Sequence, residues 1–136
     1  LIHGDLCFSN ILYNFNNNQY KLIDPRGKWG TTIFGDIKYD VAKLRHSIIG
    51  GYDSINNGLF SIKYEKSTIN LTIYRPLIYT TISRKVDEWI SEKWDLNKIK
   101  LIEGLLFISM LPLHQDNFKK QLAFYSIGIQ RLNEVI

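Results

Sequence analysis

The sequence predicts a mainly helical α+β fold with two small β-hairpins. Residues 11–23 contain two apolar runs around an Asn-rich turn, and residues 60–74 alternate apolar and polar side chains; both patterns are typical of short paired strands. From residue 36 on, the remaining segments place apolar residues at helical spacing between capping residues and prolines. With 136 residues, the chain is expected to form one domain, or a piece of one, with a buried core.

Composition narrows the classes of partner. The formal charge is +4, but basic residues are dispersed among acidic ones, with no run of five Lys or Arg and no zinc spacing, so we expect no nucleic-acid partner. No apolar run is long enough to cross a bilayer, and the N-terminus lacks the layout of a signal peptide, so we expect no membrane partner. The single Cys7 cannot form an internal disulfide, which favours a reducing, cytoplasmic location.

The first segment carries the strongest chemical signal. Asp5 and Asn10 stand five residues apart before the first predicted strand, and Asp24 follows the second. Paired strands would bring Asn10 and Asp24 to the same end of the hairpin. An Asp can accept the proton of an attacking hydroxyl, and carboxylate and amide oxygens suit Mg²⁺, so this layout indicates phosphoryl transfer. The structural alternative is a surface hairpin flanked by capping residues.

The residues after Asp24 form a predicted loop. Pro25 disfavours the helical region for the preceding residue, so we expect Asp24 to be extended. Arg26 has two open interpretations: its forked guanidinium either contacts a phosphate or pairs with an acid of the same domain. Residues 27–35 are rich in glycine and are expected to form an irregular loop over the site.

The next helix is predicted from a cap at Asp36 to a stop at Gly50. Its expected apolar stripe consists of Ile37, Val41, Leu44 and Ile48. Asp40 falls in the first turn, where the helix dipole favours a carboxylate, and His46 is expected on the surface or in packing. Residues 51–58 are expected to be a loop, followed by strands at 60–64 and 69–74 with one face exposed to solvent.

Three helices are predicted in the last part of the chain. The first spans about 77–93 after Pro76; the second begins at a cap on Asp95 or Asn97 and runs to Met110. The third begins at Asp116 or Asn117, beyond Pro112. The expected buried faces of the first and third are Ile78, Ile82, Val86, Trp89 and Ile90, and Leu122, Tyr125, Ile129 and Leu132.

Taken together, the motifs resemble those of the aminoglycoside phosphotransferase and choline kinase family, which shares the protein-kinase-like fold. They are His3-Gly4-Asp5, Asn10, Ile23-Asp24, and the run from Gly35 to Leu44, with a weaker echo at 111–114. The likeness is nearest to phosphotransferase-like proteins of bacterial capsule and surface-polysaccharide pathways. It implies the C-terminal lobe of such an enzyme, divided into catalytic and metal loops (1–35), a bracing helix (36–50), a hairpin (51–75) and a helical substrate region (76–136).

The resemblance also implies roles. Asp5 would be the catalytic base, Asn10 and Asp24 would bind Mg²⁺, and His3 and Asp40 would brace the loop. Arg26 and His114 are possible phosphate or substrate contacts, His114 because the family builds its acceptor pocket from C-terminal helices. The implied reaction transfers the ATP γ-phosphate to a hydroxyl of a sugar, aminoglycoside or amino alcohol.

Other functions stay open on the sequence alone. The family's ATP-clamping N-terminal lobe has no counterpart in these residues, so we expect this chain alone not to turn over ATP; it would need that lobe, in cis or from upstream sequence, as a partner. The same observation favours a non-catalytic pseudo-kinase or binding module. A metal-dependent hydrolase would need a second metal cluster or a nucleophile, and neither pattern is found.

Overall fold

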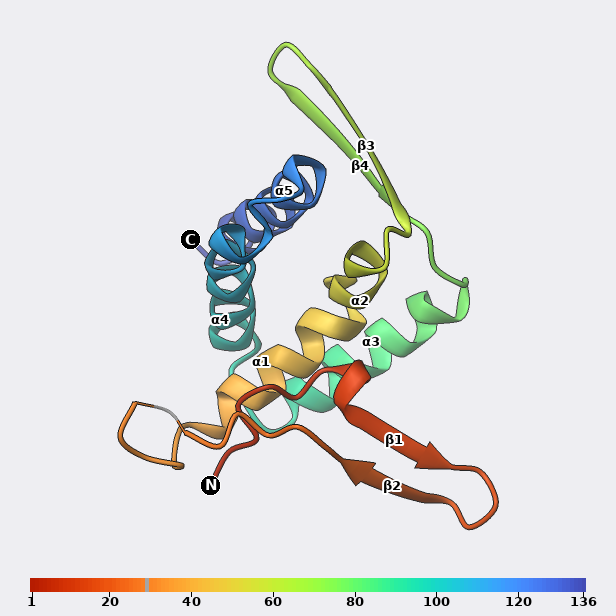
Figure 1. The fold of residues 1–136 in the computed structure, drawn as a ribbon, viewed down its shortest axis with the longest axis vertical. Coiled ribbons are helices and arrows are strands. Elements are labelled where there is room, and N and C mark those ends of the chain that lie inside the picture. The colour runs from red at the N-terminus through yellow and green to blue at the C-terminus, as the bar shows by residue number, and fades with distance from the viewer. Residues whose placement is uncertain (29) are drawn as a thin grey trace.

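The computed structural model describes residues 1–28 and 30–136, and it is an α+β fold in which helices predominate (Figure 1). Both hairpins and the long helices expected from the sequence are confirmed. The elements, in chain order, are η1 (Phe8–Asn10), β1 (Ile11–Asn14), β2 (Gln19–Leu22), α1 (Ile37–Ile48), α2 (Tyr52–Asn56), β3 (Phe60–Glu65), β4 (Thr68–Ile73), α3 (Ile78–Ser91), α4 (Leu96–Ser109), η2 (Leu111–His114) and α5 (Phe118–Asn133). A kinase-like lobe and the division of the chain into functional parts stay predictions.

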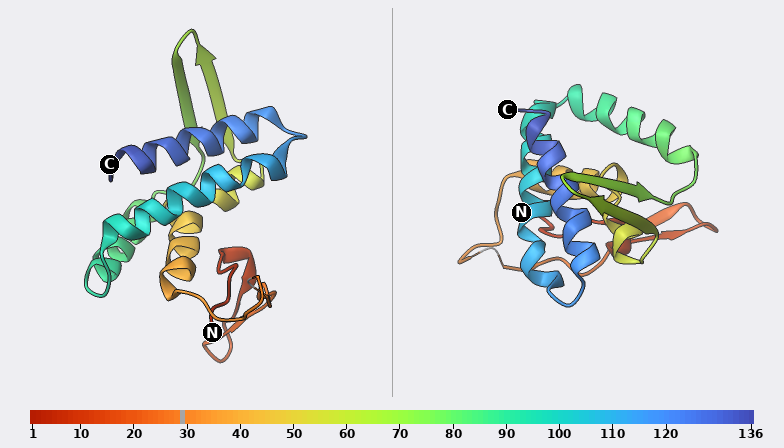
Figure 2. Two further views of the ribbon diagram at one scale, coloured as in Figure 1. Left: turned by 90° about the vertical axis from the view of Figure 1, so that its left-hand side faces the viewer. Right: turned by 90° about the horizontal axis from the view of Figure 1, so that it is seen from above.

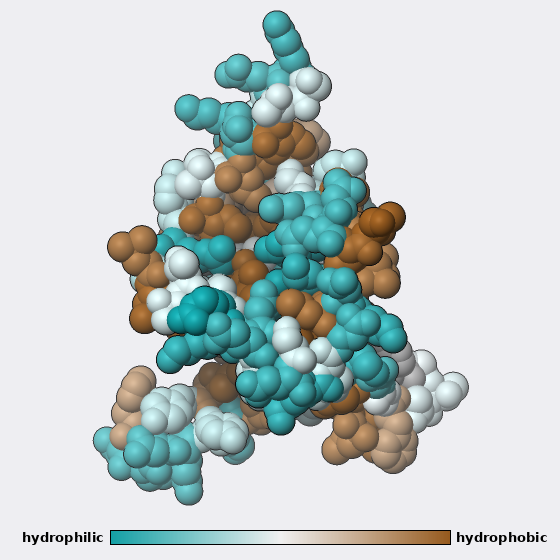
Figure 3. Space-filling view, turned by 180° about the vertical axis from the view of Figure 1, so that it is seen from behind, coloured by the Kyte–Doolittle hydropathy of each residue, from teal (hydrophilic) through white to brown (hydrophobic). Residues whose placement is uncertain are grey.

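The two hairpins form separate two-stranded antiparallel sheets. In the first, Ile11 pairs with Leu22, and both strands are almost wholly exposed. In the second, one face is half-buried against the core and the other is solvent-exposed, as predicted. Figure 1 shows the hairpins pointing away from the helices in different directions. Seen from behind, both project beyond the helical body, whose surface mixes hydrophobic and hydrophilic residues (Figure 3).

Helix α1 is the centre of the molecule. It contacts η1, α2, α3 and α4, and it is buried along nearly its whole length from Asp40 to Ile48. The buried face predicted for this helix, a single apolar stripe, was therefore too narrow, because other helices pack against α1 on several sides. Ile37 lies at the open end of the helix and is 49% exposed, while Leu44 is half-buried. Asp36 caps the helix as predicted, accepting from Lys38 N.

Helices α4 and α5 run side by side (Figure 2). They approach closely at two glycines: a Cβ on Gly104 would lie 3.2 Å from the carbonyl of Gly128 and 2.9 Å from Leu132. The predicted buried face of α5 was wrong in part, since Tyr125 is 45% exposed. Small residues set the helix rotation, so the buried face consists of Ala123, Phe124, Ile127 and Gly128, flanked by half-buried Leu122, Ile129 and Leu132.

The remaining helix predictions have mixed outcomes. Asp95 and Asn117 cap α4 and α5, each accepting backbone N–H groups of the first turn. Helix α3 lies at the edge of the bundle, so only Ile90 of its predicted face is fully buried. The loop predicted at 51–58 contains α2, because Gly51 and Gly58 take positive φ at its ends and Ile55 is buried beneath it. No helix in the described parts of the chain has both the length and the apolar character needed to cross a bilayer.

His46 is a packing residue at the centre of the core. Its ring is fully buried, 4.0 Å from the ring centroid of Phe107 and 4.7 Å from that of Tyr52. Neither ring nitrogen has a hydrogen-bond partner among the described residues. Burial, together with the nearby charge of Lys43, lowers the pKa of His46 well below its ordinary value. The folded protein therefore keeps this ring neutral.

We expect His46 to make the protein less stable in acid. The folded pKa of His46 lies below its unfolded value near 6.5, so the stabilising contribution of the neutral ring is complete above that pH. As the pH falls below 6.5, the free energy of unfolding decreases by up to about 1.4 kcal/mol per pH unit. His46→Leu should remove this slope. The measurement is the free energy of unfolding of both proteins in urea from pH 7 to 5; groups common to both cancel in the difference. Equal slopes would contradict the prediction.

Candidate active site

The segment from His3 to Asn10 is anchored to α1 by one buried carboxylate. Asp40 Oδ2 accepts a hydrogen bond from the backbone N–H of His3 at 2.7 Å, and Oδ1 accepts one from Gly4 N–H at 2.8 Å. Asp40 is 3% exposed and lies in the first turn of α1, where the helix dipole stabilises its charge. Hydrogen bonds to an ionised group are the stronger kind. The backbone before Asp5 therefore has a fixed position relative to the central helix.

The ring of His3 joins this loop to the end of the first hairpin. Asp5 N–H donates to His3 Nδ1 at 3.3 Å, so Nδ1 is the acceptor and Nε2 carries the ring proton. Nε2 then donates to the carbonyl of Ile23 at 3.0 Å. Both nitrogens are engaged with backbone groups, an arrangement that suits a bracing residue rather than an acid or base.

Asp5 and Asn10 lie in contact. The tight turn η1 brings the Asn10 side chain back, and its Nδ2 donates to the Asp5 carbonyl at 2.9 Å and to Asp5 Oδ2 at 3.3 Å. Asn10 is only 8% exposed, whereas the Asp5 side chain is 36% exposed. Because the amide nitrogen faces Asp5, the amide oxygen is directed away from it. Cys7, between them, is buried, with its Sγ 3.1 Å from Ser9 Oγ.

Lys43 is a site residue that sequence reasoning missed. Its Nζ lies 2.7 Å from Asp5 Oδ1 and 5.6 Å from the ring centroid of Tyr52, and the side chain is only 6% exposed. A buried lysine needs a partner, and here that partner is the predicted base. Lys43 follows Asp40 by three residues on α1, so both project from one helix face toward the loop. This spacing was the available signal.

Asp24 is not extended, contrary to the expectation from Pro25. Its φ is +54°, in the left-handed region, and its side chain is exposed. Hydrogen bonds on both sides impose the turn: Ile23 N–H donates to the Asn10 carbonyl at 3.0 Å and Arg26 N–H to the His3 carbonyl at 2.8 Å. The proline excludes only the right-handed alternative. A non-glycine residue in this region costs about 1–2 kcal/mol, and such strain concentrates at functional sites.

Asn10 and Asp24, the predicted magnesium ligands, offer the kinds of oxygen that a magnesium ion accepts. The backbone N–H of Ile23 donates to the Asn10 carbonyl, so Ile23 lies opposite Asn10 at the open end of the hairpin. Asp24 is the next residue along the chain from Ile23. One amide and one carboxylate oxygen, completed by phosphate and water, is a usual Mg²⁺ environment. Across residues 1–28 and 30–136, no group of three or more His, Cys, Asp or Glu side chains is placed to hold a metal. Asn10 is not among these four residue types, since it would bind a metal through its amide oxygen.

Arg26 lies against the loop and one wall of a cavity. A Cβ on Gly4, whose φ is +78°, would come within 2.9 Å of Arg26 Cβ, so only glycine fits there. The Arg26 guanidinium lies 5.9 Å from the ring centroid of Tyr39. These two side chains and the α4 residues Ile102, Leu105, Leu106 and Ser109 line a cavity of about 440 Å³. Burial, and to a smaller extent the nearby Asp5, raises the pKa of Tyr39 although Arg26 opposes it.

His114 is not brought to the loop. Its ring packs on Phe124, 4.9 Å between centroids, and Phe124 lies 5.8 Å from Tyr52, the ring beneath Lys43. Partial burial, with the charge of Lys120, lowers the pKa of His114. Two aromatic rings therefore separate His114 from Lys43, and a direct role at Asp5 would need a substrate that spans this distance.

No protein-family model, curated protein or solved structure matches this chain. The function is therefore inferred from the residues of the site and their geometry.

Proposed function

We propose that this chain carries the catalytic loop of an ATP- and Mg²⁺-dependent phosphotransferase that acts on a hydroxyl of a small molecule. The observation that supports it most is the pair of hydrogen bonds from His3 and Gly4 to Asp40, which fixes the loop so that Asp5 and Asn10 meet. A surface hairpin with incidental caps would not need a buried carboxylate from a distant helix to hold its backbone.

The roles follow from the contacts. Asp5 Oδ2 or Oδ1 accepts the proton as the acceptor hydroxyl oxygen bonds to the γ-phosphorus and the bond to the β–γ bridging oxygen breaks, releasing ADP. Lys43 and Asn10 hold the Asp5 carboxylate in orientation before that step. Asn10 and Asp24 would hold Mg²⁺, which, when bound, neutralises charge on the phosphates. His3 and Asp40 hold the loop that carries Asp5 in place against the end of the hairpin that precedes Asp24.

The cavity between Arg26, Tyr39 and α4 is the candidate acceptor pocket. One of its lining residues, Arg26, packs against Gly4, and the charge of Asp5 acts on another, Tyr39, so the cavity combines a cation and a phenol with an apolar wall. Such a lining suits a sugar with one apolar face, as in the building blocks of capsule and other surface polysaccharides, better than a cationic amino alcohol, which the Arg26 guanidinium would repel. Arg26 at its rim also suits a phosphate, because a guanidinium can bind phosphate oxygens in pairs.

The test is a coupled assay for ADP release with Mg²⁺ and ATP across sugars, aminoglycosides and amino alcohols. It is performed on this chain and on the longest protein that its gene encodes. We expect acceptor-dependent ADP release in the full gene product that disappears when EDTA removes Mg²⁺. Absence of any acceptor-dependent release across the panel, with the loop residues intact, would contradict the proposal.

A specific observation favours a second function, a non-catalytic binding module. Asp5 already has an ion pair with Lys43 and a hydrogen bond from Asn10, so its carboxylate is satisfied without substrate. A binding module would bind nucleotide or small molecule without consuming ATP. Calorimetry with Mg²⁺·ATP beside the ADP assay separates the two: binding with turnover indicates the enzyme, and binding without turnover the module.

A further inference from the structure

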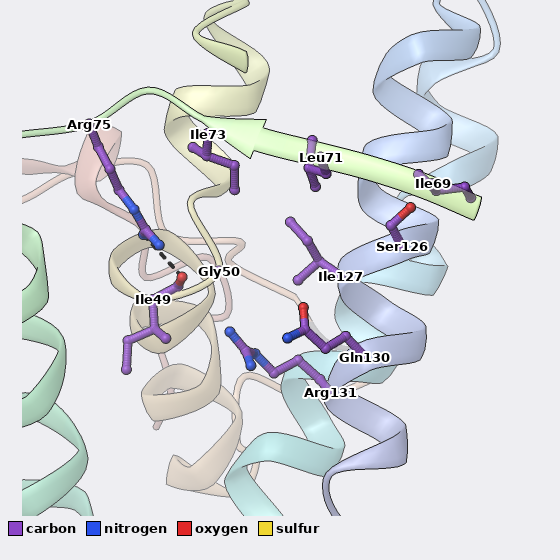
Figure 4. A pocket seen from close by; sticks show the side chains of 10 residues that line it. All are labelled: Ile49, Gly50, Ile69, Leu71, Ile73, Arg75, Ser126, Ile127, Gln130 and Arg131. Atoms are coloured by element: carbon purple, nitrogen blue, oxygen red, sulfur yellow. Dashed lines mark hydrogen bonds between the residues drawn. The ribbon is translucent and has the colours of Figure 1, made fainter. Parts of the chain in front are cut away.

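The cavity between the end of α1, strand β4 and helix α5 lies outside the proposed active site. Its volume is about 540 Å³, within the range of small-molecule pockets. Figure 4 shows the guanidinium groups of Arg75 and Arg131 turned toward the same space, with Ile73, Leu71 and Ile127 on its apolar wall. No Asp or Glu is among the residues that line it. We call it the arginine cavity.

Arg75 supplies the unbalanced charge. Its Nη1 donates to the carbonyls of Ile48 and Ile49 at the end of α1, at 3.0 and 3.1 Å, and no described carboxylate forms an ion pair with it. A guanidinium has five N–H groups, so donors remain for a ligand. Partial burial lowers the pKa of Arg75; the charge of Arg131 adds to that effect, while Tyr79 opposes it. Arg75 therefore presents an uncompensated positive charge to the cavity, which favours an anion there.

The positive charge of Arg131 is already balanced by neighbouring carboxylates. It contacts Glu134 and lies 3.5 Å from Glu103, inside a network where Arg45, Arg131 and Lys100 face Asp87, Glu103 and Glu134. Three cations and three carboxylates cancel there, so the cavity wall carries about one net positive charge, that of Arg75. A singly charged head group matches this better than a phosphate dianion does.

We propose that the arginine cavity binds a small organic carboxylate with a branched aliphatic part. The carboxylate would accept hydrogen bonds from Arg75 and Arg131, and the aliphatic part would cover Ile73 and Ile127. Gln130, at the rim, offers one more donor. The site is independent of the phosphotransfer proposal, since it shares no residue with the loop or with the cavity at Arg26.

The test follows isoleucine methyl signals by NMR while isocaproate is added to the wild-type protein. We expect saturable shifts of Ile73 and Ile127 with a Kd in roughly the millimolar range. The matching alcohol and inorganic phosphate should each bind at least about tenfold more weakly, because the first lacks the charge and the second lacks the apolar part. Equal binding of either probe, or no saturation, would overturn the proposal.

Variants locate the site. Arg75→Met should weaken isocaproate binding about tenfold or more, whereas Arg84→Met, on the exposed face of α3, should leave it unchanged. Because Arg75 also holds the end of α1, Ile69→Ser, at the partly exposed rim, provides a second variant with little cost to folding. It should weaken isocaproate but leave acetate unchanged. Unaltered isocaproate binding in both variants would place the ligand elsewhere and refute the assignment.

Discussion

Arg45→Met is expected to lower the free energy of unfolding by about 3–5 kcal/mol. Arg45 is 2% exposed and binds Asp87 with two hydrogen bonds, at 2.8 and 3.0 Å, and Glu103 with a third. It thereby joins α1 to α3 and α4. Glu103 is fully buried, so removing the guanidinium leaves a carboxylate in the core whose remaining ion-pair partner among the described residues is Arg131. Urea unfolding measures the change.

The control is Arg84→Met, which breaks the exposed pair with Glu88 and should cost no more than about 0.5 kcal/mol. A second comparison separates lost attraction from stranded charge. In Arg45→Met with Glu103→Leu, most of the stability should return, because no buried carboxylate is left unpaired. If Arg45→Met alone cost as little as Arg84→Met, the buried network would not support the fold as inferred.

In the longest protein that the gene encodes, Asp5→Asn is expected to reduce acceptor-dependent ADP release by about 10²- to 10⁴-fold, the contribution of a general base. Asparagine keeps the shape and the carbonyl but cannot accept the hydroxyl proton as a carboxylate does. Lys43 loses its ion-pair partner in this variant, so the melting temperature should fall, but the loop should keep its position because the backbone hydrogen bonds of Asp5 do not involve its carboxylate. The measurement is the initial rate in the coupled assay at saturating ATP, beside the melting temperature.

The matched control is Glu65→Gln, at the tip of the second hairpin, which removes one exposed carboxylate far along the chain from the loop. Its rate should equal that of the wild type. A rate for Asp5→Asn within about twofold of the control would rule out Asp5 as the base, whatever else the loop binds.

Local patterns were sufficient to predict most of the fold. Apolar runs around an Asn-rich turn located the first hairpin and strand alternation the second, and side-chain caps at Asp36, Asp95 and Asn117 located three helix starts, because these signals depend on residues near one another in sequence. Helix α2 was missed since five residues between glycines carry too short a period. The rotation of α5 was missed because it depends on where Gly104 meets Gly128.

One contact of the candidate site was also predictable, whereas two of its features were not. Spacing alone suggested that Asp5 and Asn10 act together, and the structure places them in contact. Lys43 and the Arg45–Glu103 pair could not be recognised with confidence from sequence, because a lysine or arginine within a helix is usually solvated until a distant carboxylate is placed beside it. Asp24 was misjudged because long-range hydrogen bonds overrode the local bias of Pro25.

The most direct test of the phosphotransfer proposal is a titration with Mn²⁺, which replaces Mg²⁺ and broadens NMR signals of nearby nuclei. We predict selective broadening of the Asn10 side-chain amide and of the backbone amides at Asp24 and Arg26, reversed by excess Mg²⁺ and strengthened by ADP. Asp24→Asn should abolish it, while Asp116→Asn should not. Broadening confined to other acidic residues, or none at these three positions, would contradict a shared cation at Asn10 and Asp24, and with it the catalytic loop.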